Sequence, residues 1–545
     1  MITELPAETV LSILSYLSIP SIRCLQLVSK HFRLLITDNE PTIYRFAAFY
    51  HGFTPSTTIK IDQLNTLRMR REILVGMKRD WKSFCQRMFQ LDDSWRGRGP
   101  STLAHYPSAG EQPAYIRVDE KEGFLISLKD VRGERPGLVV IDRVSGVVLW
   151  KQSWAVAQTY VIEYQSGYLI LNTPKWREVW RLATIPDPCP PSPAQKGSFP
   201  YPHPQQIEVS RKCLEAHRDT YPKGHFVPHA AFPYPSSARP FRMIFPTLLT
   251  LLNESEVLFY DIPSRRLTQT LLLCPDTMMT VKPGPESIPL RSLGAIWTID
   301  MSLNHVVLTS GESGSVRVFD RASGQCLLDM PNDSTPYKTV EIENDVPRHV
   351  IDPRRGNSSK LRWQPLKMTD TPPQDSLERF RDVSSSKKLR ISICGNHFVT
   401  FSSTRTDPGS GPELALVIVR NFTKIPPGET SLFARHAIQI MLGTQHATFA
   451  FDGHRRVLVA KRSKVIIFDV SKFLGSTGEI EAFAIPAFKQ TEYVHTCELT
   501  ESGIYLEWAA DGVVWGKGQR NPRRRRRTLS ETSICGVDFA MWEGS

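Results

Sequence analysis

Hydrophobic residues near the start of the chain recur at the spacing of an α-helix. Val10, Ile13, Leu14 and Leu17 fall at positions i, i+3, i+4 and i+7 of the segment 5–17. Side chains at this spacing line up along one side of a helix, while the polar residues between them face away. The pattern therefore predicts an amphipathic helix that buries one apolar stripe.

Polar residues and prolines mark where this helix and two further helices begin. Pro6 suits the first helical position, where a missing amide donor costs nothing, and Glu8 complements the positive N-terminus of a helix. Ser18 followed by Pro20 gives a second start signal, and Ser29 suits the N-cap of a third helix. The apolar faces of these two helices come from Ile22 and Leu25 and from Phe32 and Leu35.

Three short helices within about 35 residues carry more apolar positions than they can bury among themselves. Surplus hydrophobic surface on a folded domain usually marks the place where a partner binds. A helical hairpin that covers the next domain fits the same periodicity. Both interpretations stay open on the pattern alone.

A second helical pattern extends over 61–95, with apolar residues three and four positions apart and a basic opposite face. Its apolar positions are Leu67, Leu74, Met77, Trp81, Phe84, Met88, Leu91 and Trp95, and its basic ones are Arg70, Arg71, Lys78 and Lys82. A basic amphipathic helix can lie on a membrane surface or bind calmodulin. We expect instead a stalk that packs on a neighbouring domain and buries Trp81, Phe84 and Trp95.

After Pro100 the helical spacing stops and short strand patterns replace it. Four segments share one form, in which an apolar run is followed by Asp and a turn. These segments are 137–146, 256–267, 315–324 and 464–473, with weaker copies at 178–182, 415–422 and 511–518. An Asp at this place can accept hydrogen bonds from nearby backbone amides and so set the turn into the next strand.

Strand units that repeat every 40–60 residues or so, without helices between them, predict a β-propeller of about seven blades. A tandem of β-sandwiches is the rival fold. Two stretches, 185–240 and 331–388, interrupt the repeat with Pro-rich and polar sequence, and we expect them to be long, partly disordered insertions between blades. The segment 533–542 is strand-like and is placed to complete the first blade and close the ring.

The N-terminal pattern resembles the F-box motif. The resemblance rests on Leu5-Pro6, Glu8, Ile13-Leu14, Leu17, Ile22, Leu25, Val28-Ser29-Lys30 and Phe32. In that family the motif packs against the Skp-type adaptor of SCF ubiquitin ligases and is joined through it to a cullin. The resemblance implies an adaptor-binding surface, partly shared with the core of the module, made of Leu5, Pro6, Glu8, Ile13, Leu14, Leu17, Ile22, Leu25, Val28 and Phe32.

Two later segments resemble parts of F-box/WD-repeat proteins. The unit that ends at Gly324 looks like a WD repeat with Phe319 in place of Trp, although the Gly-His dipeptide of that family is missing from most units. The segment 92–97 resembles the short hinge between F-box and propeller, with Ser94 in place of Asn. The implied domains are an all-α F-box over 1–45, a helical stalk over 46–100 and an all-β propeller over 101–545.

Composition and charge narrow the chemical class of the binding partner. Of 545 residues, 41% are hydrophobic and 22% are charged, which are ordinary values for a globular protein. The formal net charge of +12 fits an acidic, phosphorylated or nucleic-acid partner, but five of these charges belong to the run Arg523–Arg527. That run resembles a nuclear-import or nucleic-acid patch. Since no reading helix or aromatic platform accompanies it, we do not expect nucleic acid as the partner.

Nine cysteines are spread singly without a C-x-x-C pair, which indicates reduced thiols. The N-terminus lacks the basic segment of a signal peptide, and the sequence has no run of about 18 apolar residues that would span a membrane. We therefore expect a cytoplasmic or nuclear protein, or both, that does not use a membrane.

Candidate chemistry is sparse. Cys213, His217, His225 and His229 form a C-x3-H-x7-H-x3-H set, but this spacing fits no common zinc pattern, so we expect neither metal nor cofactor. GESGS at 311–315 lacks the last Gly of a nucleophile elbow, and the sequence has no phosphate-binding or dinucleotide loop. The sequence therefore offers no catalytic residues, and we expect no enzyme activity in the chain itself.

The combined interpretation is a substrate receptor of an SCF-type ubiquitin ligase. Its F-box binds the adaptor and its propeller binds an unknown protein substrate, for which a phosphorylated protein is one candidate. The rate of ubiquitin transfer then comes from proximity alone. The alternative is a propeller scaffold that binds partners without ubiquitination, for which the nucleus is one candidate location. A propeller hydrolase is a third hypothesis. Adaptor binding separates the first from the other two.

Overall fold

The computed structural model divides the chain into two compact units. The first contains residues 1–104, 357–363 and 537–545, and the second contains residues 105–356 and 364–536. The residues that the structure describes are 5–51, 53–54, 56–61, 80–99, 101–107, 113–129, 137–152, 162–173, 176–189, 200–233, 240–252, 256–273, 296–310, 315–330, 338–342, 364–371, 388–392, 394–404, 413–425, 433–443, 447–461, 465–475, 479–485, 491–500, 502–510 and 532–539.

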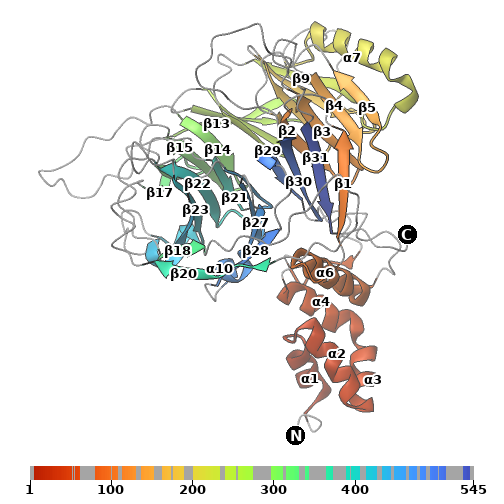
Figure 1. Ribbon diagram of the computed structural model, residues 1–545, viewed down its shortest axis with the longest axis vertical. Helices are drawn as coiled ribbons and strands as arrows, with labels where there is room; N and C mark the ends of the chain where they lie inside the picture. The colour runs from red at the N-terminus through yellow and green to blue at the C-terminus, as the bar shows by residue number, and fades with distance from the viewer. Residues whose placement is uncertain are drawn as a thin grey trace, which may run out of the picture. The chain divides into compact units, whose positions relative to one another are not determined.

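Helices dominate the first unit (Figure 1). They are α1 (Ala7–Leu14), α2 (Ile19–Val28), α3 (Lys30–Asp38), α4 (Glu40–Tyr50) and α6 (Trp81–Trp95). Ser18 and Ser29 cap α2 and α3 as predicted, since their side chains accept hydrogen bonds from the amides of Ser21 and Phe32 at 3.3 and 3.2 Å. The three predicted helices are confirmed together with these two caps.

The start of α1 and the presence of α4 differ from the sequence-based expectation. Pro6 is the N-cap of α1 and not its first helical residue, so the helix begins one residue later. Helix α4 was not expected, although a proline also occupies its first turn and it buries Ile43, Tyr44, Ala47 and Ala48. These four side chains make α4 the packing surface for the stalk helix.

Helix α6 confirms the helical pattern over the second half of the range 61–95. Asp80 caps it by accepting a hydrogen bond from the Ser83 amide at 2.7 Å. The predicted stripe is buried at Trp81, Phe84, Met88, Leu91 and Trp95. It packs on α4, and the rings of Trp95 and Phe539 lie 4.2 Å apart between centroids. The earlier part of the predicted stripe, Leu67, Leu74 and Met77, lies outside the described residues.

The second unit is built from sheets that form the seven blades of a β-propeller. Blades 1 to 4 each hold four strands in chain order. Blade 1 has β2 (Pro113–Asp119), β3 (Phe124–Lys129), β4 (Gly137–Asp142) and β5 (Val148–Gln152). Blade 2 has β6 (Ile162–Gln165), β7 (Tyr168–Asn172), β8 (Trp176–Leu182) and β9 (Phe226–Pro233). Blade 3 has β10 (Phe241–Ile244), β11 (Thr247–Leu251), β12 (Glu256–Asp261) and β13 (Arg266–Leu272). Blade 4 has β14 (Ile296–Met301), β15 (His305–Ser310), β16 (Val316–Asp320) and β17 (Cys326–Met330).

The remaining blades take strands from distant parts of the chain. Blade 5 has β21 (Lys388–Ile391), β22 (Phe398–Thr404), β23 (Glu413–Val419) and β24 (Ala437–Gly443), extended by β18 (Lys338–Ile342) and β20 (Met368–Thr371). Blade 6 has β25 (Ala447–Phe451), β26 (Arg456–Lys461), β27 (Val465–Asp469) and β28 (Glu481–Ile485), extended by β19 (Gln364–Pro365). Blade 7 has β29 (Thr491–Leu499), β30 (Gly503–Ala510), β31 (Thr532–Asp538) and β1 (Thr102–Pro107).

The inner edge of the propeller is a ring of seven strands, one from each blade. They are β2, β6, β10, β14, β21, β25 and β29, each the end strand of its sheet. Neighbours in this ring contact one another from β25 through β29 and β2 to β21. A single ring of this kind excludes the rival tandem of sandwiches.

The ring closes through blade 7, where Figure 1 shows the orange β1 beside the dark blue β31. The C-terminal segment is thus a strand, as expected, but it belongs to the last blade and not to the first. The first strand completes the last blade, because β1 takes the outer edge of the sheet β1-β31-β30-β29. Side chains reinforce the joint, since Glu120 in blade 1 accepts hydrogen bonds from Thr500 and Ser502 in blade 7 at 2.7 Å each.

The predicted role of Asp after the apolar runs is confirmed in all four strong units. The third strands of these four blades end at Asp142, Asp261, Asp320 and Asp469. Each carboxylate accepts a hydrogen bond from a Ser amide two or three residues later, at 2.7 to 3.1 Å. These bonds fix the turn into the fourth strand.

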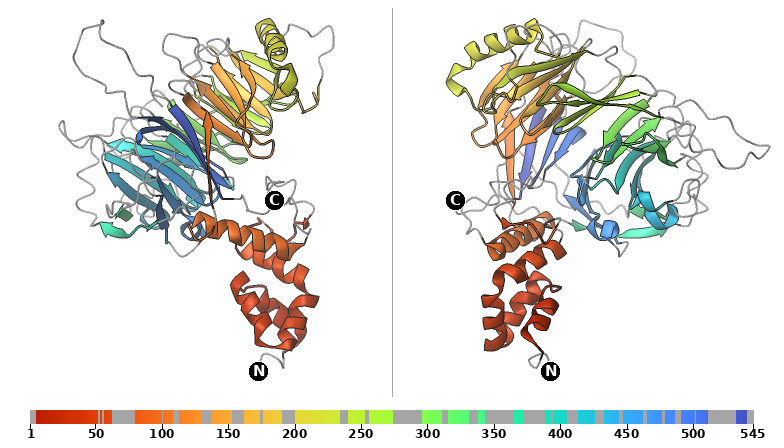
Figure 2. Two further views of the ribbon diagram at one scale, coloured as in Figure 1. Left: turned by 45° about the vertical axis from the view of Figure 1, so that its right-hand side comes forward. Right: turned by 180° about the vertical axis from the view of Figure 1, so that it is seen from behind.

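The range 185–240 is more regular than the expected insertion. It contains α7 (Pro204–Ala216), the short helix η4 (Arg218–Thr220) and β9, the outer strand of blade 2. Helix α7 buries Val209 and Cys213 against β5 and β9, where Figure 2 shows it as a yellow-green helix beside the blades. The expectation of a partly disordered insertion did not include this helix, which begins at Pro204.

The range 331–388 also contributes strands. Strand β18 pairs in parallel with β24 in blade 5, β20 pairs with β18, and β19 pairs with β28 in blade 6. This segment therefore adds to the outer edges of two neighbouring blades. The boundaries of both insertions stay predictions.

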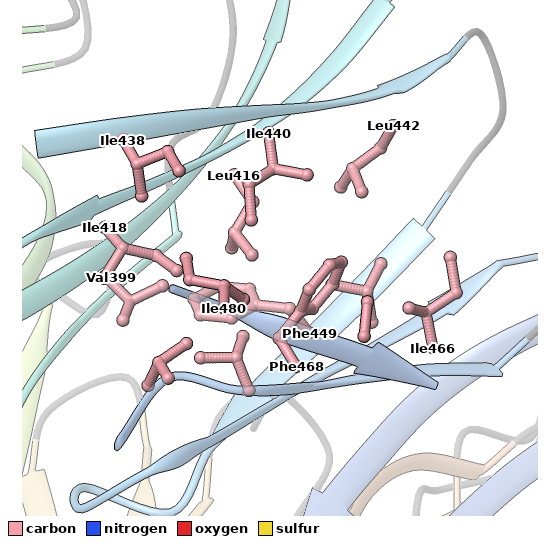
Figure 3. Packing of buried hydrophobic residues seen from close by; sticks show 14 of the residues in the cluster. Val399, Leu416, Ile418, Ile438, Ile440, Leu442, Phe449, Ile466, Phe468 and Ile480 are labelled. Carbon is pink, nitrogen blue, oxygen red and sulfur yellow. The ribbon is translucent and has the colours of Figure 1, made fainter. Parts of the chain in front are cut away.

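The propeller core lies between neighbouring sheets. Figure 3 shows one cluster in which Val399, Leu416 and Ile418 of blade 5 face Phe449 and Phe468 of blade 6. The rings of Phe401 and Phe449 stack there with centroids 5.5 Å apart. Burial of this apolar surface holds each blade on the next, at about 25 cal/mol per Å² removed from water.

The carboxyl group of Glu178 on β8 is hydrogen-bonded to Trp180, a member of the apolar cluster between blades 1 and 2. Its side chain is 5% exposed and accepts a hydrogen bond from Trp180 Nε1 at 3.2 Å. Burial raises the pKa of Glu178 to about 7. The folded protein therefore holds this proton more tightly than the unfolded chain does.

We predict that Glu178→Gln flattens the pH dependence of propeller stability. The stability contribution of the proton on Glu178 is fully present below pH 4.5 and is lost as the pH rises towards 7, on the order of 3 kcal/mol in all. Thermal unfolding of the full chain between pH 5 and 8.5 should show the wild type losing stability relative to the variant. Parallel curves would contradict the assignment.

Candidate functional site

The residues of the expected adaptor surface divide into an exposed and a buried group. Leu5, Ile13 and Val28 are 41%, 42% and 69% exposed, and Pro6 and Glu8 are exposed as well. Large apolar side chains at these exposures are available to a partner. They lie on α1, on the residues that precede it and at the end of α2.

The other group belongs to the core of the module. Leu14 and Ile22 are buried at 2% and 0% exposure, while Leu17, Leu25 and Phe32 are half-buried. Their direct effect is therefore to hold α1, α2 and α3 together. A contact with a partner through Leu14 or Ile22 would require that the helices first move apart.

Three exposed apolar side chains were not expected from the sequence. Tyr16, Leu27 and Leu34 are 71%, 87% and 52% exposed. The expectation assigned apolar residues to a helical stripe and thus to the core, and these three lie off that stripe. They enlarge the hydrophobic surface that the helical module presents.

The second candidate site is a ring of charges on the inner strands of the propeller. Six blades each contribute one ionisable side chain to it, and the sign alternates from strand to strand. The six are Glu498 (β29), Arg117 (β2), Glu163 (β6), Arg242 (β10), Asp300 (β14) and Arg390 (β21).

Ion pairs connect most neighbours in this ring. Arg242 lies between two carboxylates of this series, with its guanidinium 2.7 Å from Glu163 and 2.9 Å from Asp300. Arg117 is 3.0 Å from Glu498 and 3.9 Å from Glu163. One network of charge-assisted contacts therefore joins blades 7, 1, 2, 3 and 4.

The electrostatics of the ring follow from burial and from these pairs. Burial by itself would raise the pKa of Glu163, but Arg242 and Arg117 hold the pKa of that carboxyl below its usual value. Burial would lower the pKa of Arg242, and Asp300 and Glu163 raise it instead. Glu163 and Arg242 thus keep their charges because their neighbours in the ring carry the opposite sign.

The carboxylate of Asp300 also ties blade 4 to blade 5. Its second oxygen accepts a hydrogen bond from the backbone amide of Ile391 on β21 at 3.0 Å. The adjacent Arg390 donates to the backbone oxygen of Leu389 at 3.1 Å. Burial and the nearby Arg242 lower the pKa of Arg390, although Asp300 and Glu163 act in the opposite direction.

The conceivable zinc residues have other partners. Cys213 lies in the apolar cluster under α7, where burial raises its thiol pKa to about 11. His225 shares a hydrogen bond with Thr220 Oγ1 at 2.9 Å. His229 is hydrogen-bonded to the backbone oxygen of Ile262 at 2.8 Å and contacts Arg265. Within the described ranges no group of three or more His, Cys, Asp or Glu side chains is placed to hold a metal ion.

Two other sequence features lie mostly or wholly outside the described part of the chain. They are the GESGS segment, of which Ser315 alone is described, and the basic run Arg523–Arg527. Among the described helices none combines the length and apolar character needed to cross a membrane.

Comparison with known proteins adds a family for the helical module. Residues 2–46 match the family described as F-box-like. No curated protein matches the chain. The solved WD40 repeats of RRP9 are 10% identical, covering 80% of this chain and 97% of that chain, with a TM-score of 0.40. The structure of U3-55K is 10% identical and covers 81% of this chain and 100% of that chain, with a TM-score of 0.42. The structure of Kluyveromyces lactis Hsv2 is 8% identical and covers 66% of this chain and 80% of that chain, with a TM-score of 0.33.

We predict that Arg242→Gln strongly destabilises the propeller. The change leaves the buried carboxylates Glu163 and Asp300 without their shared cation, which typically costs about 3–5 kcal/mol. The loss should shrink at acid pH, because the freed carboxyl groups then take up protons. Thermal unfolding at pH 7 and pH 4.5 tests both statements.

Arg211→Gln is the matched control for this prediction. Arg211 on α7 also contacts two carboxylates, those of Glu208 and Glu215 at 2.9 and 2.5 Å, but all three side chains are largely exposed. Its removal should leave the unfolding temperature almost unchanged, since solvent screens such pairs. Equal effects of the two substitutions would remove the special role of the ring.

Proposed function

We propose that this chain, whose F-box-like domain at residues 2–46 and seven-bladed propeller match the architecture of an F-box/WD-repeat protein, is a substrate receptor of an SCF-type ubiquitin ligase. The F-box-like domain carries the proposal, because F-box domains generally bind Skp-type adaptors. Through the adaptor the receptor reaches a cullin, and the propeller holds the protein substrate.

The exposed side chains of the helical module support adaptor binding. Leu5, Ile13 and Val28 keep 41% to 69% of their surface open, although each is large and apolar. Covering such side chains with a partner releases about 25 cal/mol per Å² of apolar surface. We propose that Leu5, Pro6, Glu8, Ile13 and Val28 touch the adaptor directly, and that Leu14, Leu17, Ile22, Leu25 and Phe32 support them from the core.

The propeller supports the second half of the proposal, substrate binding. Interblade contacts such as Glu120 with Thr500, and the ion pairs on the inner strands, join blades 7, 1, 2, 3 and 4 to one another. A rigid platform holds a bound protein with little loss of entropy in each encounter with the ubiquitin-charged enzyme. The receptor itself then needs no catalytic group.

The chemistry of the described cysteines supports a reducing compartment. Cys24, Cys85, Cys189, Cys213, Cys326, Cys394, Cys497 and Cys535 are all free thiols. Free cysteines at this number are typical of proteins that work in the cytosol or nucleus. We propose one or both of these locations for the receptor.

The decisive experiment is adaptor binding by the full-length chain. The double substitution Leu5→Ala with Pro6→Ala, combined with Val28→Ala, should reduce recovery of a purified Skp-type adaptor by about ten-fold or more, since three exposed contacts are lost. The thermal transition of the propeller should stay where it is. Surface plasmon resonance or co-purification measures the first quantity and calorimetry the second.

Leu303→Ala is the matched control for the F-box variant. Leu303 is 79% exposed, but it lies between β14 and β15 in the propeller. This variant should bind the adaptor like the wild type. Equal recovery of adaptor by the wild type and the triple variant would rule out the proposed surface and favour a scaffold without ubiquitination.

A further inference from the structure

Strand β21 turns two cations towards the inner ring of the propeller. Lys388 and Arg390 are two residues apart and so lie on the same face of the strand. The residues on the other face, Leu389 and Ile391, belong to the apolar cluster between blades 4 and 5. The pairing of β21 with β22 fixes this register, so neither cation can exchange places with an apolar neighbour.

The carboxylates of the ring are already engaged elsewhere. Glu163 and Asp300 both contact Arg242, and Glu498 contacts Arg117. The partners given for Lys388 and Arg390 within the described residues are neutral oxygens: Lys388 Nζ donates to Thr448 Oγ1 at 3.4 Å and Arg390 donates to the oxygen of Leu389. Arg390 of the ring and its neighbour Lys388 therefore form no ion pair with a described side chain.

The number of blades explains why this surplus lies at β21. Charges of alternating sign can close around an even number of positions, but a ring of seven must contain two like neighbours or one neutral position. The neutral position falls on β25, where Thr448 accepts a hydrogen bond from Lys388 on β21 and lies 3.9 Å from Cys497 Sγ on β29. An anion placed next to Thr448 would meet Lys388 of β21, with Arg390 two residues further along the same face of the strand.

The surroundings of Lys388 suit an anion that arrives from solvent. Its side chain is accessible to water, yet enough protein surrounds the ammonium group that burial lowers its pKa. Arg390 is half-buried and its pKa is lowered as well. An oxyanion would gain charge-assisted hydrogen bonds from both side chains, and the planar guanidinium can bind two of its oxygens at once.

We propose that Lys388, Arg390 and Thr448 bind a small tetrahedral oxyanion of the phosphate or sulfate type, which joins blades 5 and 6 at the inner ring. The bound anion is a structural ligand of the propeller. Its binding is independent of the adaptor surface and of any protein substrate, so the two proposals succeed or fail separately.

The test is thermal unfolding of the purified full-length chain at pH 7 with inorganic phosphate as the probe. Sodium chloride at matched ionic strength gives the reference, because a ligand that binds the folded state alone raises the unfolding temperature with its concentration. The wild type should show a saturable rise, and isothermal titration calorimetry should give a dissociation constant. Absence of a saturable rise beyond the chloride reference would overturn the proposal.

Matched substitutions assign the effect to β21. Lys388→Met should weaken phosphate binding by about ten-fold or more, since a charged hydrogen-bond donor is lost, whereas Lys388→Arg should preserve it. Lys121→Met removes an equally accessible lysine, 68% exposed on blade 1, and should leave binding unchanged. An unchanged dissociation constant in Lys388→Met, or an equal loss in Lys121→Met, would contradict the site.

Discussion

The ion network on the inner strands is the constraint around which the propeller is organised. Each blade buries its faces against two neighbours, but at the inner edge seven strands converge and their side chains must share one small space. Charges of one sign would repel there, and unpaired charges would be costly to bury. Alternation from Glu498 to Asp300 resolves both problems over five blades, with Arg242 bonded to carboxylates on either side.

Because the number of blades is odd, the alternation of charge in this network fails at one position. Thr448 of β25 occupies the position where alternation fails, and strand β21 carries Lys388 and Arg390, whose hydrogen bonds go to neutral oxygens. Closure of the ring depends on a second feature, the sheet of blade 7, which combines strands from the start and the end of the propeller. There β1 from the start of the propeller pairs beside β31 from its end, so the chain cannot open at that point without breaking a sheet.

In the helical module the apolar residues are divided between a small core and an exposed surface. Helices of eight to eleven residues such as α1 and α4 gain little stability alone and must share a core. Leu14 and Ile22 supply that core, while Leu27 and Val28 at the end of α2 stay exposed. A domain so small has too few interior positions for all its apolar residues, and the remainder forms the surface offered to a partner.

Local rules by themselves determined much of this protein. The caps Ser18 and Ser29, the buried stripe of α6 and the turn-setting Asp142, Asp261, Asp320 and Asp469 depend on neighbours a few residues away, so the sequence predicts them. The tertiary structure decided which apolar residues of the F-box-like helices are core and which are surface, and it placed α7 and β9 in a range that reads as a loop. It also decided the charge ring, because Glu163, Arg242 and Asp300 lie more than 50 residues apart in sequence and meet only when their blades are arranged around one ring.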